Sequence, residues 1–147
     1  MNILVAGGTG FIGKKIVETL SDNNHKVFIL TRNINHHKNS FGTNIKLIDW
    51  DTINPTMLSK ISILIKLNGE KVDQLWTKKT KRKILLSRIE TTNLLYQFCE
   101  KNQIIPKQLI NASAVGIYAK NNALYDNPVD ENSSHGNTFL SNVCVQN

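Results

Sequence analysis

The sequence is poor in cysteine and in long apolar runs, and each shortage excludes a class of protein. Its 147 residues contain two cysteines, Cys99 and Cys144, which lie far apart and have no C-x-x-C partner. This excludes a disulfide-stapled secreted domain and favours free thiols in a reducing cytosol. The longest mostly apolar stretch, residues 61–67, is far shorter than the ~20 residues that cross a bilayer. We therefore expect a cytoplasmic protein without a membrane span.

Acidic residues are also scarce relative to basic ones. Eighteen Lys and Arg stand against eleven Asp and Glu, which gives a formal net charge of +7 and a pI near 9.5. Such a charge suits nucleic acid, anionic lipid or a phosphorylated small molecule, and it does not choose among them. The content of 40% hydrophobic and 20% charged residues is ordinary for a globular chain and excludes disordered and collagen-like classes.

The first 32 residues have the pattern strand, glycine turn, helix, strand. Residues 2–6 form a short run rich in β-formers, and GGTGFIG follows at residues 7–13. Apolar residues then recur at helical spacing, and residues 25–32 (HKVFILTR) read as a buried strand. Asn23-Asn24 suits the exit from the helix, because asparagine tolerates positive φ. Parallel strands joined in this way are covered on both faces, which predicts further units of the same kind.

The alternation of strand and helix patterns continues along the chain. Later segments read in order as a strand, a short helix or turn, a strand, a long helix and a strand, at residues 45–48, 55–60, 61–67, 80–103 and 107–112. After Tyr118 the composition turns to Asn, Asp, Ser and Gly, and only residues 138–145 read as another short helix.

These patterns predict an α/β fold. We expect a Rossmann-like, doubly wound and mainly parallel sheet of about five strands. The length fits one domain, residues 1–147, of which residues 120–147 form an irregular, loop-rich end.

The glycine turn is the strongest functional motif. Gly7, Gly10 and Gly13 stand at three-residue spacing, directly after a strand and at the opening of a helix. In that context Gly7 permits the tight turn, Gly10 lets the backbone approach a pyrophosphate, and Gly13 allows close packing of helix on strand. Free N–H groups at the helix start complement the anion. The motif predicts a dinucleotide site, and the alternative is a turn that serves packing only.

The end of the second strand indicates which dinucleotide binds. An acidic residue ~20 positions after the glycines typically holds the ribose 2′-hydroxyl of NAD. This chain has Thr31, Arg32 and Asn33 there, and a guanidinium suits a 2′-phosphate, which favours NADP over NAD. The alternative is that Arg32 is a solvated cation. Asp49 and Asp51 close the third strand, where either carboxylate suits contact with the adenine edge or the capping of a turn.

Two further groups of residues favour structural interpretations. A basic run opens the long helix, where it opposes the macrodipole and has no aromatic interleaving; it consists of Lys78, Lys79, Lys81, Arg82 and Lys83. A solvated face is therefore favoured over a nucleic-acid site. His36-His37 has no ligand partner at metal spacing, so no metal site is predicted.

Several segments together resemble the NADP-binding epimerase/dehydratase-like proteins of the extended short-chain dehydrogenase/reductase superfamily. The resemblance is greatest to an atypical branch labelled sugar-nucleotide epimerase or cell division inhibitor, and it runs nearly end to end. It rests on ILVAGGTGFIG, HKVFILTR, Asp-Trp-Asp at 49–51, LNGEKV, Trp76 followed by KILLSRIETTNLL, ASAVGIY, and DENSSHGNTFLSNVC.

The resemblance implies roles for several residues. Thr9, Gly10, Phe11 and Ile12 would lie along the pyrophosphate, with Arg32 beside the 2′-phosphate. Leu67, Asn68 and Gly69 would line the ribose side of the cofactor, and Ser113 would sit near the nicotinamide. The chain departs from the branch at Lys66, Asn68, Asn111, Ile117 and Ala119, where the branch has Asn, Ala, Ser, Tyr and Gly.

The chemistry of the wider superfamily needs a Tyr-x-x-x-Lys pair, in which the lysine lowers the pKa of the tyrosine. Tyr96, Tyr118 and Tyr125 are followed four residues on by Glu, Asn and Val, so this chain lacks the pair. Ser113 and Tyr118 are the catalytic candidates that remain; Asp130, Glu131 and His135 are weaker substitutes.

The resemblance also implies that the substrate-binding half is missing, because the branch continues beyond FLSNVC into a final strand and a further domain. The first hypothesis is an NADP(H)-binding domain with weak or absent catalysis. The alternatives are a non-catalytic nucleotide sensor that regulates a partner, and an oxidoreductase or epimerase active only as an oligomer. Faces left uncovered by a missing half favour self-association, so a homo-oligomer is expected.

Overall fold

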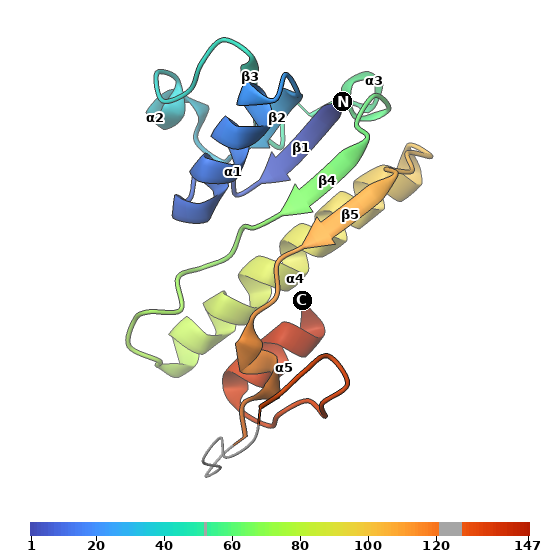
Figure 1. Ribbon diagram of the computed structural model, residues 1–147. Coiled ribbons are helices and arrows are strands. Elements are labelled where there is room, and N and C mark those ends of the chain that lie inside the picture. Colours follow the sequence, from blue (N-terminus) through green and yellow to red (C-terminus); the bar gives the residue numbers. More distant parts are fainter. Residues whose placement is uncertain (52, 121–127) are drawn as a thin grey trace. The chain divides into compact units, whose positions relative to one another are not determined.

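The computed structural model describes residues 1–51, 53–120 and 128–147, and these divide into two compact units. The sheet unit comprises residues 1–69 and 93–112, and the second unit comprises residues 70–92 and 113–147. The long helix α4, Lys78–Lys101, contributes residues to both (Figure 1).

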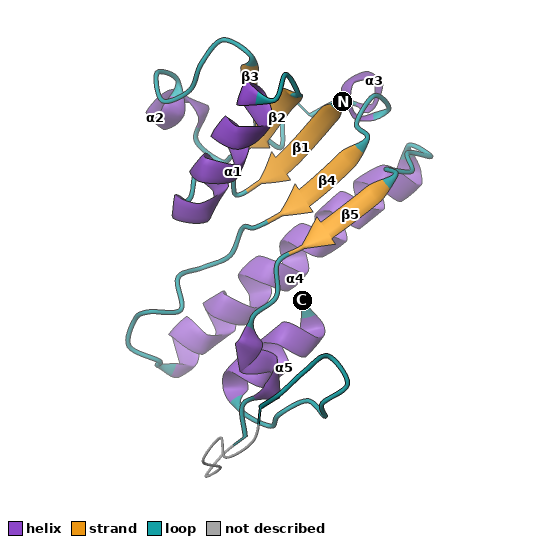
Figure 2. Ribbon diagram, viewed as in Figure 1, coloured by secondary structure: helices purple, strands orange, loops and turns teal. Residues whose placement is uncertain are grey.

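The sheet unit holds five parallel strands in the order β3-β2-β1-β4-β5 (Figure 2). Their bounds are Asn2–Ala6 for β1, Lys26–Leu30 for β2, Ile45–Ile48 for β3, Ile63–Lys66 for β4 and Gln108–Asn111 for β5. The predicted parallel sheet is confirmed. Its strand order reverses beside β1, because the chain runs outward to β3 and then returns to add β4 on the other side of β1.

The helices are α1 Phe11–Asp22, α2 Ile34–His37, α3 Pro55–Leu58, α4, the 3-10 helix η1 Val115–Tyr118, and α5 Phe139–Gln146. Of these, α1, α3, α4 and α5 were predicted, with small shifts at their ends, whereas α2 and η1 were not. The predicted helix exit is also confirmed, since Asn24 follows α1 with φ of +61°. The strand expected at residues 61–67 is shorter in the structure. Ile61 is apolar because it is buried in the core, but it lies outside β4.

Both faces of the sheet are covered by apolar side chains. On one face Val5 and Ile29 pack with Val17 of α1. On the other face Leu4 and Phe28 belong to a cluster that includes Leu95 of α4. Strands buried on both faces read as continuous apolar runs, which is why the sequence shows them without alternation.

The second unit is built around α5 and η1. The hydroxyl of Ser141 on α5 is fully buried and donates a hydrogen bond of 2.9 Å to the carbonyl oxygen of Ile117 in η1. The ring of Trp76 meets that of Phe139 edge to face, with centroids 5.4 Å apart. Within the end that was expected to be irregular, α5 occupies the place that its helical spacing predicted.

No helix in the described part of the chain is long and apolar enough to cross a membrane. Cys99 and Cys144 are both free thiols. Burial raises the pKa of the Cys99 thiol above its ordinary value, so less thiolate is present at neutral pH than in an exposed cysteine.

The core of the sheet unit can be tested with a matched pair of leucines. Leu4 is fully buried in the central strand, whereas Leu109 on the outer strand β5 is 62% exposed. We expect Leu4→Ala to lower the free energy of unfolding by about 2–5 kcal/mol, because it leaves a cavity, and Leu109→Ala by less than about 1 kcal/mol. Urea denaturation followed by circular dichroism measures both, and equal losses would contradict the assigned core.

Candidate functional site

The turn after β1 carries the first part of the site. Gly7 has φ of +87°, a conformation that residues with a side chain rarely adopt. A Cβ at Gly7 would lie 2.6 Å from the backbone nitrogen of Asn68 and 2.8 Å from the carbonyl carbon of Leu67. Gly7 is therefore glycine because the segment after β4 touches its backbone, in agreement with its predicted role in the turn.

Two other glycines serve the packing of α1. A Cβ on Gly13 would collide with the carbonyl oxygen of Gly7, which confirms the predicted close packing of helix on strand. Gly8 was not singled out from the sequence. A Cβ there would come within 3.0 Å of the side chains of Ile29 and Val17. The two adjacent glycines at positions 7 and 8 are the feature of the sequence that could have indicated a role for Gly8.

Gly10 differs from these, because packing inside the chain explains little of its identity. The nearest atom to a Cβ at Gly10 would be the carbonyl oxygen of Gly7 at 3.3 Å. Gly10 is the N-cap of α1, no side chain caps the helix, and its first turn has no acidic residue. Phe11 is 97% exposed and Ile12 64%. The start of α1, with Thr9 half-buried beside it, thus leaves its positive end open to an anion.

Arg32 lies at the same edge of the sheet, just beyond β2. The N–H of Thr31 donates to the carbonyl oxygen of Ile48, and the side chain of Asn33 accepts a hydrogen bond from the N–H of His36 and caps α2. Both neighbours of Arg32 are therefore held by structural bonds. The exposed guanidinium forms no ion pair with any described residue, so it is available to an anionic ligand.

Beyond β3, the two carboxylates divide the roles that the sequence left open. The side chain of Asp49 accepts a hydrogen bond of 3.2 Å from the N–H of Asp51, which is the turn-capping arrangement. Asp51 is exposed to solvent. Asp51 therefore stays the predicted contact for the adenine edge.

The end of β4 brings Leu67 and Asn68 to the glycine turn. The N–H of Leu67 donates to the carbonyl oxygen of Ala6 at 2.8 Å. Lys66 is only 3% exposed, and its ammonium donates to the amide oxygen of Asn111 at 3.3 Å. Lys66 and Asn111 are direct neighbours in the register of β4 and β5. Two of the departures from the branch pattern therefore contact each other.

Comparison with known proteins places this site in a family. The model of the NAD dependent epimerase/dehydratase family matches residues 3–142. The chain belongs to that family. The epimerase family protein YfhF of Bacillus subtilis is 34% identical over 143 residues, which are 97% of this chain and 46% of that protein. An epimerase family protein of Staphylococcus saprophyticus is 33% identical over 144 residues, 97% of this chain and 47% of that protein.

Solved structures of the family confirm the Rossmann-like fold. The human epimerase family protein SDR39U1, isoform 2, was solved with NADPH; it matches with a TM-score of 0.76 and 27% identity over 99% of this chain and 47% of that one. A UDP-glucose 4-epimerase matches in fold with a TM-score of 0.73 and 15% identity, over 99% of this chain and 44% of that one. The chain thus spans about half the length of the epimerase family proteins it matches.

The two predicted catalytic residues of this epimerase-family chain lie in the second unit. Ser113 is exposed just before η1, and Tyr118 ends η1 with its side chain half-buried. Tyr96 is on α4 in the sheet unit, where its hydroxyl donates to Glu100 at 3.1 Å. That hydrogen bond raises the pKa of Tyr96, which disfavours a phenolate. Tyr125 lies outside the described residues.

The neighbouring residues Ser87 and Arg88 attach a loop to α4. The hydroxyl of Ser87 accepts a hydrogen bond from the N–H of Glu70 at 2.8 Å and donates to the carbonyl oxygen of Ile84 at 3.1 Å. Arg88 donates to the carbonyl oxygens of Glu70 and Ile84 at 3.3 and 2.8 Å. These side chains hold the start of the loop that follows Gly69 against α4.

The basic run at the start of α4 is mostly exposed, with one exception. The ammonium of Lys81 lies 5.3 Å from the ring centroid of Phe139 and 5.9 Å from that of Trp76, so it takes part in packing as well as in solvation. Across residues 1–51, 53–120 and 128–147, no three His, Cys, Asp or Glu side chains gather as a metal site requires.

The glycine turn predicts losses of stability of different size for two similar substitutions. Gly7→Ala should lower the free energy of unfolding by about 2 kcal/mol or more, because its φ is left-handed and the new Cβ meets backbone atoms of Asn68. Gly10→Ala should change it by less than about 1 kcal/mol, because the added methyl group meets little. Urea denaturation compares the two, and a larger loss for Gly10→Ala would refute this assignment.

The loop contact predicts a local effect of Ser87→Ala. The N–H of Glu70 loses its acceptor, so we expect its amide hydrogen to exchange faster and the chain to lose about 1–3 kcal/mol of stability. Thr92→Ala is the matched control, since the Thr92 hydroxyl bonds to the carbonyl oxygen of Arg88 within α4. Hydrogen exchange of Glu70 that is unchanged by Ser87→Ala, or equally changed by Thr92→Ala, would show that the contact does not hold the loop.

Proposed function

We propose that this epimerase-family chain binds NADP(H) at the glycine turn of the sheet unit and that it has weak or no catalytic activity by itself. The observation that carries the binding is the open start of α1 at Gly10, where no side chain caps the helix and a Cβ would meet only the carbonyl oxygen of Gly7, at 3.3 Å. Backbone N–H groups at such a helix start suit a pyrophosphate.

The preference for the 2′-phosphorylated cofactor rests on Arg32. Its exposed guanidinium follows β2, at the sheet edge where Gly7 follows β1, and β1 and β2 are neighbours in register. A guanidinium forms charge-assisted hydrogen bonds with a phosphate and gains nothing comparable from a ribose hydroxyl. The human relative at 27% identity was solved with NADPH, which supports the same preference.

Weak or absent catalysis rests on the chemistry of the tyrosines. Of the described tyrosines, Tyr96 has its pKa raised by Glu100, and neither Tyr96 nor Tyr118 has a lysine four residues on. Without a phenolate near neutral pH, removal of a proton from a sugar hydroxyl lacks its usual base. Ser113 and Tyr118 remain the residues through which any residual activity would run.

Binding is tested by titrating the chain with NADPH and NADH in parallel, followed by nucleotide fluorescence. We expect saturable binding that prefers NADPH. Arg32→Ala should weaken the binding of NADPH by about 10- to 100-fold, which is the contribution of a charge-assisted hydrogen bond. It should weaken the binding of NADH by less than about twofold. Arg82→Ala is the matched control, because Arg82 is also exposed and its loss changes the net charge equally.

Three outcomes would contradict this proposal. A folded chain that binds neither nucleotide would show that the glycine turn serves packing alone. Equal weakening by Arg32→Ala and Arg82→Ala would show that only overall charge matters. Equal affinity of the unsubstituted chain for NADPH and NADH would remove the role of Arg32.

A further inference from the structure

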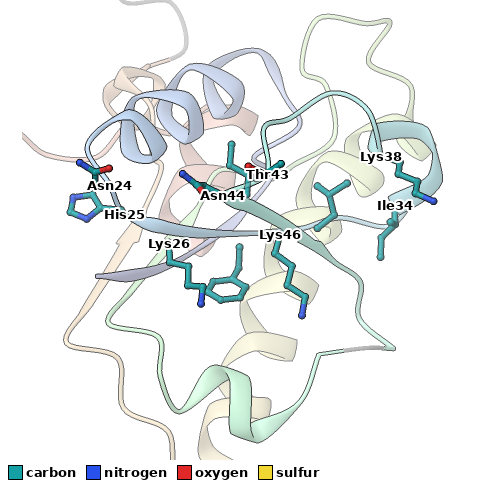
Figure 3. Close-up of a pocket in the computed structure, with 11 residues that line it drawn as sticks. Asn24, His25, Lys26, Ile34, Lys38, Thr43, Asn44 and Lys46 are labelled. Atoms are coloured by element: carbon teal, nitrogen blue, oxygen red, sulfur yellow. The ribbon is translucent and has the colours of Figure 1, made fainter.

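A groove runs along the outer strand β3 (Figure 3). Its volume is about 610 Å³, within the range of about 300–1,000 Å³ that is typical of small-molecule sites. It is formed by the start of β2, the strand β3 with the residues before it, and α2. The residues that line it are Asn24, His25, Lys26, Phe28, Ile34, Lys38, Thr43, Asn44, Ile45, Lys46 and Leu47.

Part of the groove lies at the amino ends of the strands, whereas the glycine turn follows β1 at the carboxyl ends. Asn24 and His25 precede β2, and Thr43 and Asn44 precede β3, so this part of the groove is at the amino ends. Ile34 of α2 and Lys38 come after β2, so the groove also reaches toward the carboxyl end of that strand. Gly7 and Arg32 follow β1 and β2 at the carboxyl ends. The length of β2 separates these ends by about 13 Å. No residue predicted to bind the dinucleotide lines the groove.

The charge of the groove is of one sign. Lys26, Lys38 and Lys46 are exposed, and the eleven lining residues include no Asp or Glu. Lys26 and Lys46 extend from the same face of the sheet (Figure 3), because Lys46 pairs in register with Phe28, two residues after Lys26. Like charges placed diagonally on neighbouring strands repel each other, and an anion between them would relieve that repulsion.

The groove also has an apolar part. Phe28 is only 7% exposed and belongs to the core, and Ile34 is half-buried. Thr43 and Asn44 add a hydroxyl and an amide group that can hydrogen-bond a ligand. A purely ionic patch would not combine these features, whereas a site for a small molecule with an apolar body and a charged end would.

We propose that this groove binds a small phosphorylated molecule, with the phosphate between Lys26 and Lys46 and the apolar part of the ligand against Phe28 and Ile34. Phosphate fits the ammonium groups because lysine acts as a point charge toward phosphate oxygens and a dianion can satisfy two lysines at once. The apolar floor favours a small molecule over the backbone of a nucleic acid, for which the lining offers no row of exposed aromatic side chains.

The test is a titration of the 147-residue chain with phenyl phosphate, followed residue by residue in ¹⁵N–¹H NMR spectra. We expect saturable shifts at the amides of residues 26–28 and 44–47, and inorganic phosphate should bind these residues at least threefold more weakly. The double variant Lys26→Gln/Lys46→Gln should bind phenyl phosphate at least fivefold more weakly than the unsubstituted chain. The control Lys60→Gln/Lys101→Gln removes the same charge from exposed positions outside the groove and should change affinity less than twofold.

Three results would overturn this site. Shifts confined to residues 7–13 would mean that phenyl phosphate uses the helix start of the dinucleotide site. Equal weakening by both double variants would mean that binding follows net charge alone. Inorganic phosphate that binds as tightly as phenyl phosphate would show that the apolar part of the ligand does not contribute to binding. None of these results would contradict the binding of NADPH at the glycine turn, so the two proposals fail independently.

Discussion

The geometry of the sheet unit around the glycine turn depends on one close approach, between the backbone of Gly7 and the backbones of Leu67 and Asn68. It occurs where the strand order reverses, so the turn after β1 and the segment after β4 meet at the same edge. The hydrogen bond from Leu67 to Ala6 holds the two segments together. Because Gly13 then packs on Gly7, main-chain contacts decide where α1 begins and where its open end points.

The contact between Lys66 and Asn111 shows how this chain accommodates a cation that its relatives' pattern lacks. Burying an ammonium group is costly unless hydrogen-bond acceptors surround it. The amide oxygen of Asn111 on β5 supplies one, and β5 lies on the far side of β4 from β1. The side chain is therefore drawn away from the glycine turn, so the two departures from the branch pattern act together and leave the segment at Leu67 and Asn68 in place.

The sequence predicted the parallel sheet because each central strand is buried on both faces and reads as an apolar run. Element ends were less predictable, because apolar periodicity and hydrogen bonding stop at different residues. The helix expected from residue 80 begins at Lys78, since the hydroxyl of Thr77 accepts the N–H of Thr80 and supports an earlier start. The contacts of Ser87 with Glu70 and of Lys66 with Asn111 escaped prediction, because they join residues 17 and 45 positions apart and depend on packing and register.

The net charge of +7 did not choose among nucleic acid, anionic lipid and a phosphorylated small molecule as partners, and the structure places the cations in different surroundings. Lys81 packs on aromatic rings, Lys66 is buried, Arg32 stands at the carboxyl end of β2, and Lys26 stands at its amino end. Charges in solution are screened over about 8 Å at physiological salt, less than the length of about 13 Å of β2. Cations at the two ends therefore act separately. The excess of positive charge in the composition therefore consists, in this fold, of separate cations whose roles are set by their local surroundings.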